Sequence, residues 1–263
     1  MIIEYHRPEK LEEALALLGR TNPQSLAMGG GTVLTQPEAH LRTPLLAAGA
    51  SFAVVDLQAL GLDGISRSGR SLTVGATVRL QTLLAEPDLP QALRQALELE
   101  ASANLRQAAT LAGRLVSADG RSPLATVMLA LAADVTIRAA AGPEQVYGLG
   151  DLLPLRADVL QGRLVTSLSF PLQVKTAYAY SARTPADRPV VCAALAQWPS
   201  GRVRLALGGF GALPLLVLDG PEAGGLETAA RSAYAYAGDA WASAEYRSAV
   251  AGELALRCLE NLN

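Results

Sequence analysis

The sequence predicts a protein of the α+β class, because helical and strand-like hydrophobic patterns are interleaved at first and separated later. In the first two-thirds of the chain, short apolar runs bounded by glycine or proline alternate with segments of helical spacing. In the last third, adjacent strands are followed by two helices, which is typical of a separate α+β unit. Half of the 263 residues are hydrophobic and 17% are charged, so one large or two modest globular domains are expected.

The elements of the first two-thirds follow from these patterns. Helical spacing predicts helices over residues 10–18, 78–84, 89–103 and 124–132. Gly19 supplies a stop for the first of these helices, and Thr77 is expected to cap the second. Short apolar runs predict strands over residues 24–28, 52–57, 135–139 and 162–172. Residues 64–76 are predicted to form a hairpin with Ser68-Gly69 at its turn, and residues 109–115 to form a loop.

The C-terminal third contains the more regular pattern. Strands are predicted over residues 189–198, 202–211 and 213–218, and helices over residues 222–237 and 243–259. Ser243 stands at the capping position of the last helix. The boundary with the preceding domain is expected near residues 171–176.

Composition excludes several classes of function. The formal net charge is −2 and no basic stripe occurs, so nucleic acid and anionic membrane are not expected partners. Glu4 and Arg7 come too early for a secretory signal, which predicts a cytoplasmic protein. With two histidines and two cysteines the chain has no iron–sulfur or zinc pattern, and Cys192 and Cys258 are expected to be buried apolar residues. Any redox chemistry therefore requires an organic cofactor.

Two side-chain-poor segments are candidate anion sites. A predicted strand runs into Gly29-Gly30-Gly31-Thr32, where several backbone N–H groups are free of side chains, as in sites that bind phosphate. The segment "ATLAGRL" around Thr110 and Gly113 has the same character, so the two could hold a pyrophosphate from opposite sides. The alternative is that the glycines only form tight or flexible loops. The spacing matches neither a Rossmann fingerprint nor a P-loop.

Six motifs in order resemble the FAD-binding medium subunit, or FAD domain, of molybdenum hydroxylases such as carbon monoxide dehydrogenase and xanthine dehydrogenase. The resemblance runs nearly from end to end of the chain. The motifs are "YHRPEKLEEALALL", "AMGGGTVL", "VVDLQALGLDGI", "SLTVGATVRLQTL", "LRQAATLAGRLVSADGRSPLATVMLALAADVTI", and "RTPADRPVVCAALA" with "GRVRLALGGFGALP".

The resemblance implies a two-subdomain FAD-binding fold of the vanillyl-alcohol-oxidase type over residues 1–172, with subdomains of about 1–57 and 58–172. A small C-terminal α+β domain over residues 173–263, with an antiparallel sheet and helices, would follow. It further implies an oxidoreductase subunit that accepts electrons from [2Fe–2S] clusters and passes them from FAD to an external acceptor. A molybdopterin-binding large subunit and a [2Fe–2S] small subunit are the expected partners.

By the same resemblance, the candidate cofactor-binding residues belong to two loops and one acidic position. They are Gly29, Gly30, Gly31, Thr32, Thr110, Ala112, Gly113, Arg114 and Asp119. No catalytic residue and no metal ligand is expected. Asp119 is alternatively a turn residue in "ADGR". Asp56 is either a flavin contact or a strand-end residue, and Tyr178 or Tyr180 either covers the flavin ring or lies on a strand surface.

The chain departs from the family pattern at several positions, and those in and after the second segment bear most directly on FAD binding. Ala112 stands where the family has glycine, Arg114 replaces an amide, and Ser122-Pro123 replaces a Ser-Asp pair. The alternative function is therefore a flavin-free member of the family that acts as a structural or assembly subunit.

Overall fold

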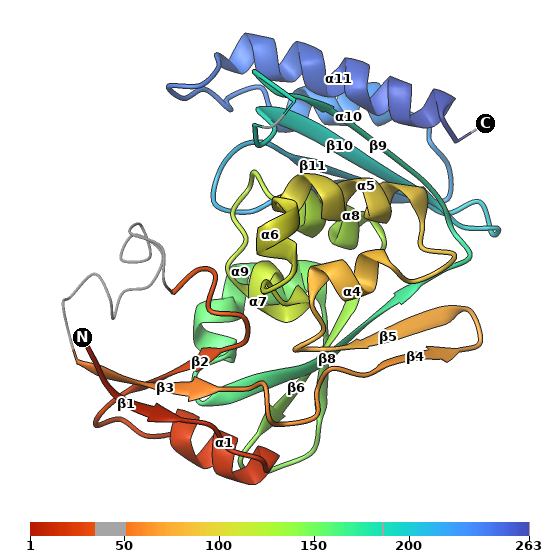
Figure 1. Cartoon of the computed structure of the whole chain (residues 1–263). Coiled ribbons are helices and arrows are strands. Elements are labelled where there is room, and N and C mark those ends of the chain that lie inside the picture. The colour runs from red at the N-terminus through yellow and green to blue at the C-terminus, as the bar shows by residue number, and fades with distance from the viewer. Residues whose placement is uncertain (35–50, 186, 263) are drawn as a thin grey trace. The chain divides into compact units, whose positions relative to one another are not determined.

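The computed structural model describes residues 1–34, 51–185 and 187–262, and it divides them into two compact units (Figure 1). Unit 1 comprises Met1–Ala85, Ala103–Ser117 and Asp134–Ser169, and unit 2 comprises Glu86–Ser102, Ala118–Ala133 and Phe170–Asn263. Two segments from the first half of the chain therefore pack with the C-terminal third. The domain boundary between residues 172 and 173 stays a prediction.

Unit 1 is built on two sheets. The three-stranded sheet has the order β1-β3-β2, with both neighbours of the central strand parallel to it. Its strands are β1 (Ile2–His6), β2 (Ser25–Met28) and β3 (Phe52–Asp56). The five-stranded sheet has the order β4-β5-β8-β6-β7. Its strands are β4 (Ile65–Ser68), β5 (Ser71–Gly75), β6 (Asp134–Ala139), β7 (Gln145–Gly148) and β8 (Arg163–Pro171).

Short helices accompany these sheets in unit 1: α1 (Leu11–Leu18), α4 (Leu80–Leu84), α6 (Ala103–Arg106), α7 (Leu111–Val116) and α9 (Leu149–Val159). Helix α1 forms because its apolar residues share one face, and that face packs with Val55 and Leu57. Strand β3 is buried along its whole length, which explains its continuous apolar sequence.

Unit 2 is a four-stranded antiparallel sheet with helices on both faces (Figure 1). The sheet order is β12-β11-β10-β9, formed by β9 (Lys175–Ser181), β10 (Val191–Gln197), β11 (Val203–Gly208) and β12 (Leu215–Gly220). Helices α10 (Leu226–Ala233) and α11 (Ala244–Glu260) cover one face. Helices α5 (Gln91–Glu100) and α8 (Pro123–Ala130) cover the other.

Alternation along the strands assigns side chains to the two layers of unit 2. Ala193, Leu195 and Leu205 pack with the apolar faces of α10 and α11. On the opposite face, the Cys192 thiol donates to Thr126 Oγ1 of α8 and the Arg204 guanidinium donates to the Leu129 carbonyl. Because helices cover both faces, β10 and β11 are apolar at nearly every position.

Several predicted elements are confirmed, including the first helix, the two adjacent C-terminal strands and the Ser243 cap, whose Oγ accepts from Tyr246 N at 3.2 Å. Cys192 and Cys258 are buried and free, as predicted. The hairpin is confirmed, but its two-residue turn is Gly69-Arg70, because Ser68 pairs with Ser71. Gly69 adopts φ +58°, which glycine permits.

Two local predictions are wrong, and some elements were not predicted. Thr77 does not cap a helix, because Val78 O accepts from Leu111 N and Leu80 N donates to Ala109 O, so the chain stays extended and α4 starts at Leu80. Residues 109–115 were expected as a loop, but they contain helix α7. Strand β7 and helix α9 were not predicted. In α9, Gly150 and Pro154 interrupt the helical pattern. Within the described ranges, no helix combines the length and apolar character that crossing a membrane requires.

Candidate functional site

The triple-glycine segment follows β2 and lies directly against residues 108–110. An ideal Cβ on Gly30 would be 1.8 Å from the Ala108 carbonyl oxygen, and one on Gly29 would be 2.6 Å from Thr110 Oγ1. Gly31 adopts φ +70°, a conformation that favours glycine. Each glycine is therefore required by the fold: the first two by close contact with the second segment and the third by its backbone conformation.

The second segment is held in place by hydrogen bonds within unit 1. Leu80 N donates to Ala109 O and Leu111 N donates to Val78 O, both at 2.9 Å. Thr110 is the N-cap of α7, and its Oγ1 accepts from Gly113 N at 3.2 Å. The Thr110 hydroxyl thus fixes the first turn of α7, where Gly113 is exposed.

The expected convergence of the two segments is therefore present in unit 1. At their junction, the backbone amides of Gly30 and Ala112 form no hydrogen bond with any residue the structure describes. Amides in this state can donate to an anionic ligand without breaking a bond in the protein.

Both segments line one cavity of about 840 Å³, a volume within the range of small-molecule sites. Its lining includes Gly29, Gly30, Gly31, Thr32, Thr110, Ala112 and Gly113. The described lining also contains three guanidinium groups and no carboxylate, from Arg20, Arg156 and Arg163. Arg20 pairs with Glu4 at 2.8 Å, and Arg163 donates to Gln145 Oε1 at 2.9 Å. Glu4 offsets part of the Arg20 charge from outside the lining, but the described lining itself carries no carboxylate and so favours an anion.

These three arginines were not identified from the sequence. Arg20 follows α1, Arg156 lies on α9 and Arg163 begins β8, so they are separated by up to 143 positions. No local motif connects them, because only the fold brings them to one cavity.

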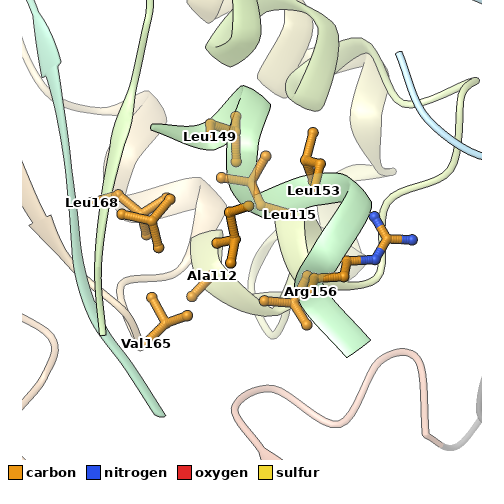
Figure 2. A pocket seen from close by; sticks show the side chains of 10 residues that line it. Ala112, Leu115, Leu149, Leu153, Arg156, Val165 and Leu168 are labelled. Carbon is orange, nitrogen blue, oxygen red and sulfur yellow. The ribbon is translucent and has the colours of Figure 1, made fainter. Parts of the chain in front are cut away.

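Ala112 does not place its methyl group in open space. The residue is 7% exposed and lines a small apolar cavity of about 10 Å³ between α7, α9 and β8 (Figure 2). Leu115, Leu149, Val165 and Leu168 surround the same space. The departure from glycine at this position is accommodated by apolar packing within unit 1.

The remaining candidate residues lie elsewhere. Arg114 is half-buried on α7 and is not part of the cavity lining. Asp119 belongs to unit 2, where its carboxylate accepts from both terminal nitrogens of Arg188 and from Arg121 N. These contacts agree with its alternative interpretation as a turn residue. The cofactor roles of both residues stay predictions.

Three further positions have defined surroundings. Asp56 accepts from the Tyr5 hydroxyl and from Gln58 N, consistent with the strand-end alternative. Tyr178 is 6% exposed in unit 2, where burial raises the pKa of its phenol well above the usual value. Tyr178 and Tyr180 stack with ring centroids 5.9 Å apart on one face of β9.

The comparisons with known proteins identify the family. Residues 1–173 match the family model described as the FAD binding domain in molybdopterin dehydrogenase. The chain belongs to this family. Molybdopterin dehydrogenases are oxidoreductases, and membership indicates FAD as the cofactor.

Individual curated proteins match most of the chain. Uncharacterized protein YgfM from Escherichia coli (strain K12) is 29% identical over 259 residues, which cover 97% of this chain and 94% of the relative. The glyceraldehyde dehydrogenase medium chain from Sulfolobus acidocaldarius is 26% identical over 82% of this chain and 78% of its own length.

The fold of this chain also matches that of a solved structure. A chain of carbon monoxide dehydrogenase from Hydrogenophaga pseudoflava superimposes with a TM-score of 0.80 over 100% of this chain and 97% of the other, at 21% identity. The predicted α+β fold of the FAD-binding medium-subunit type is thereby confirmed.

The described residues fit FAD as judged from unit 1 alone. The cavity offers two unpaired amides beside a glycine segment, three guanidinium groups and an apolar wall that includes Leu26, Leu57 and Val165. A diphosphate requires the first two features and a nucleoside benefits from the third. The described residues contain no group of three or more His, Cys, Asp or Glu side chains able to hold a metal ion.

Proposed function

We propose that this chain is the FAD-binding electron-transfer subunit of a molybdenum-containing hydroxylase or dehydrogenase in the cytoplasm. It would accept electrons from [2Fe–2S] clusters of a small partner subunit and deliver them to an external acceptor. A large molybdopterin-binding subunit would oxidise the substrate. The observation that carries the proposal is the convergence of two side-chain-poor segments on one cation-lined cavity. The medium-chain relative from Sulfolobus acidocaldarius supports it.

Each group in the cavity has a defined task in this proposal. Gly29, Gly30, Gly31 and Thr32 would hold the pyrophosphate from one side, and Thr110, Ala112 and Gly113 would hold it from the other. Arg20 and Arg163 lower the electrostatic cost of its negative charges. Bound FAD supplies the electron-carrying chemistry, while the residues of this chain hold it.

The role of the cavity arginines is tested by Arg20→Gln. This variant keeps polarity but loses one positive charge on the cavity wall, and a lost hydrogen bond to a charged group is worth about 1.5–3 kcal/mol. The dissociation constant for FAD, measured by flavin fluorescence, should therefore rise about tenfold at low salt, with a smaller difference at high salt.

The matched control is Arg257→Gln, since Arg257 is an exposed arginine of α11 outside the cavity lining. Thermal unfolding of each apoprotein separates a folding defect from a binding defect. Equal FAD affinity in wild type and Arg20→Gln would contradict the role of Arg20. Absence of any FAD complex in the wild-type chain at micromolar concentrations would contradict the proposed function itself.

One observation favours the second candidate, a flavin-free structural subunit. Ser122 is 1% exposed and its hydroxyl donates to Glu100 Oε2 at 2.7 Å, and Pro123 has no N–H group. The Ser-Asp pair that the resemblance associates with the flavin thus has no equivalent at these positions. An absorption spectrum of the purified chain distinguishes the candidates. Protein without flavin bands that gains FAD binding through Pro123→Asp would support the structural subunit.

A further inference from the structure

The half-exposed indole of Trp241 in unit 2 contacts two guanidinium groups. The Arg121 Cζ lies 4.3 Å from the ring centroid and the Arg183 Cζ lies 4.7 Å from it. Both distances are typical of cation–π contacts. Trp241 is 47% exposed and Arg183 is exposed, so this Arg121–Trp241–Arg183 cluster faces solvent.

The loop that presents Trp241 is held by hydrogen bonds to the Asp239 carboxylate and to the buried Arg247 guanidinium. Asp239 Oδ1 accepts from the backbone amides of Trp241 and Ala242 at 2.7 and 3.1 Å. The fully buried Arg247 donates to Asp239 Oδ1 at 2.9 Å and to the Ala237 carbonyl at 2.6 Å. A loop fixed in this way loses little conformational entropy when a partner binds.

In the described part of the protein, neither guanidinium group of the cluster is bonded to a carboxylate, although Asp119 and Asp239 act on Arg121 from a longer distance. Neither Arg121 nor Arg183 forms an ion pair with a described residue. The other tryptophan of the chain offers a comparison. The Arg202 Cζ lies 5.2 Å from the centroid of the Trp198 ring, but Arg202 also forms a bidentate ion pair with Asp219 at 2.8 and 2.9 Å. The charge beside Trp198 is thus paired directly with a carboxylate, whereas Arg183 has no such ion pair with a described residue.

The hydrogen-bond donors of the cluster point to the same conclusion. Arg121 donates two hydrogen bonds, to the carbonyls of Pro189 and Arg188, at 2.9 and 2.6 Å. Arg183 donates to no described residue, so its planar fork remains available for a carboxylate. Since two guanidinium groups already cover the indole, charge and directed donors remain as the features that a ligand can recognise.

We propose that the Arg121–Trp241–Arg183 cluster docks an acidic segment of a partner protein, with Arg183 binding a carboxylate through its planar fork. Charge complementarity selects this occupant, and tryptophan and arginine are the residue types that dominate binding energy at protein interfaces. Tyrosine is a third such residue type, and unit 2 exposes Tyr246, whose hydroxyl lies 3.0 Å from Ser181 Oγ. All of these residues belong to unit 2, so the inference does not depend on FAD binding in unit 1.

The test uses tryptophan fluorescence of the full chain carrying Trp198→Phe, which leaves Trp241 as the single tryptophan. The probe is a blocked hexaglutamate peptide at low ionic strength, compared with hexalysine and with inorganic pyrophosphate. We expect a saturable change with hexaglutamate, none with hexalysine, and affinity for pyrophosphate weaker than for hexaglutamate. Salt should weaken the binding.

Variants then locate the site. Arg183→Gln should raise the dissociation constant for hexaglutamate about tenfold, which is the loss of one charged hydrogen-bonded contact. Arg202→Gln is the matched control and should leave that constant unchanged. Because Arg183 is exposed, the Arg183→Gln variant should unfold at the same temperature as the parent protein. No saturable binding of hexaglutamate, equal binding by Arg183→Gln, or tighter binding of pyrophosphate would each overturn the proposal.

Discussion

Substitution of Gly30 by alanine tests the junction on which the candidate site depends. The added Cβ would lie 1.8 Å from the Ala108 carbonyl oxygen and 2.6 Å from its carbonyl carbon. Ordinary contact begins at 3.4 Å, so the two segments must separate by about 1.6 Å. Residues 108–110 cannot retreat freely, because the hydrogen bonds of Leu80 and Leu111 hold them.

The expected loss follows from this displacement. Overpacking of this kind costs about 1–3 kcal/mol, and the upper end applies here because the obstructing atoms are backbone. A loss of about 3 kcal/mol lowers the Tm of a chain of this size by roughly 6–12 °C. The dissociation constant for FAD should rise about tenfold or more, since both segments must hold the pyrophosphate at once.

Differential scanning fluorimetry and flavin-fluorescence titration measure the two effects. Gly64→Ala is the matched control, because a Cβ at Gly64 meets no atom within 4 Å and its φ is not positive. Wild-type Tm and FAD affinity in Gly30→Ala would refute the argument, since the segments would then not be in contact. A lowered Tm with unchanged FAD affinity would show that the two segments are in contact but that this contact is not needed for FAD binding.

Two further predictions concern a helix cap and a buried thiol. Thr110→Val removes the hydroxyl that accepts from Gly113 N, so urea unfolding should show a loss of about 1 kcal/mol, whereas Thr110→Ser should retain most of the stability. Burial raises the pKa of the Cys192 thiol from 9.0 to about 11. The folded protein therefore holds the thiol proton more tightly than the unfolded chain does. The stability that follows from this difference is present in full below pH 9 and is lost as pH rises from 9 to 11, by about 3 kcal/mol. The free energy of unfolding of Cys192→Ala should therefore fall less steeply over that interval, and an identical slope would contradict the cause assigned.

Local periodicity predicted much of the fold. The helix at residues 10–18 and the strands around residues 191–208 were recognisable because their patterns record which faces are buried. The Ser243 cap was recognisable because its hydrogen bond joins residues three apart. The two side-chain-poor segments, at residues 29–32 and 109–115, could be recognised for the same reason, since each is defined by consecutive residues.

Other features depend on partners distant in sequence. Val78 and Arg79 stay extended because residues 109–111 pair with them, which overrides a plausible helix start. Asp119 pairs with Arg188, 69 positions away, and no local pattern indicates that contact. The second segment was expected as a loop, yet packing and the Thr110 cap make it a helix.

The sequence by itself determined the family, the cofactor class and the short-range elements, because motifs and hydrophobic periods are properties of neighbouring residues. The tertiary structure decided that Gly29 and Gly30 are needed for contact with residues 108–110, and that Arg20, Arg156 and Arg163 line one cavity. It also decided that Ala112 is tolerated, because its methyl group packs in an apolar space. These outcomes arise from distances between segments far apart along the chain, and such distances exist only once the chain has folded.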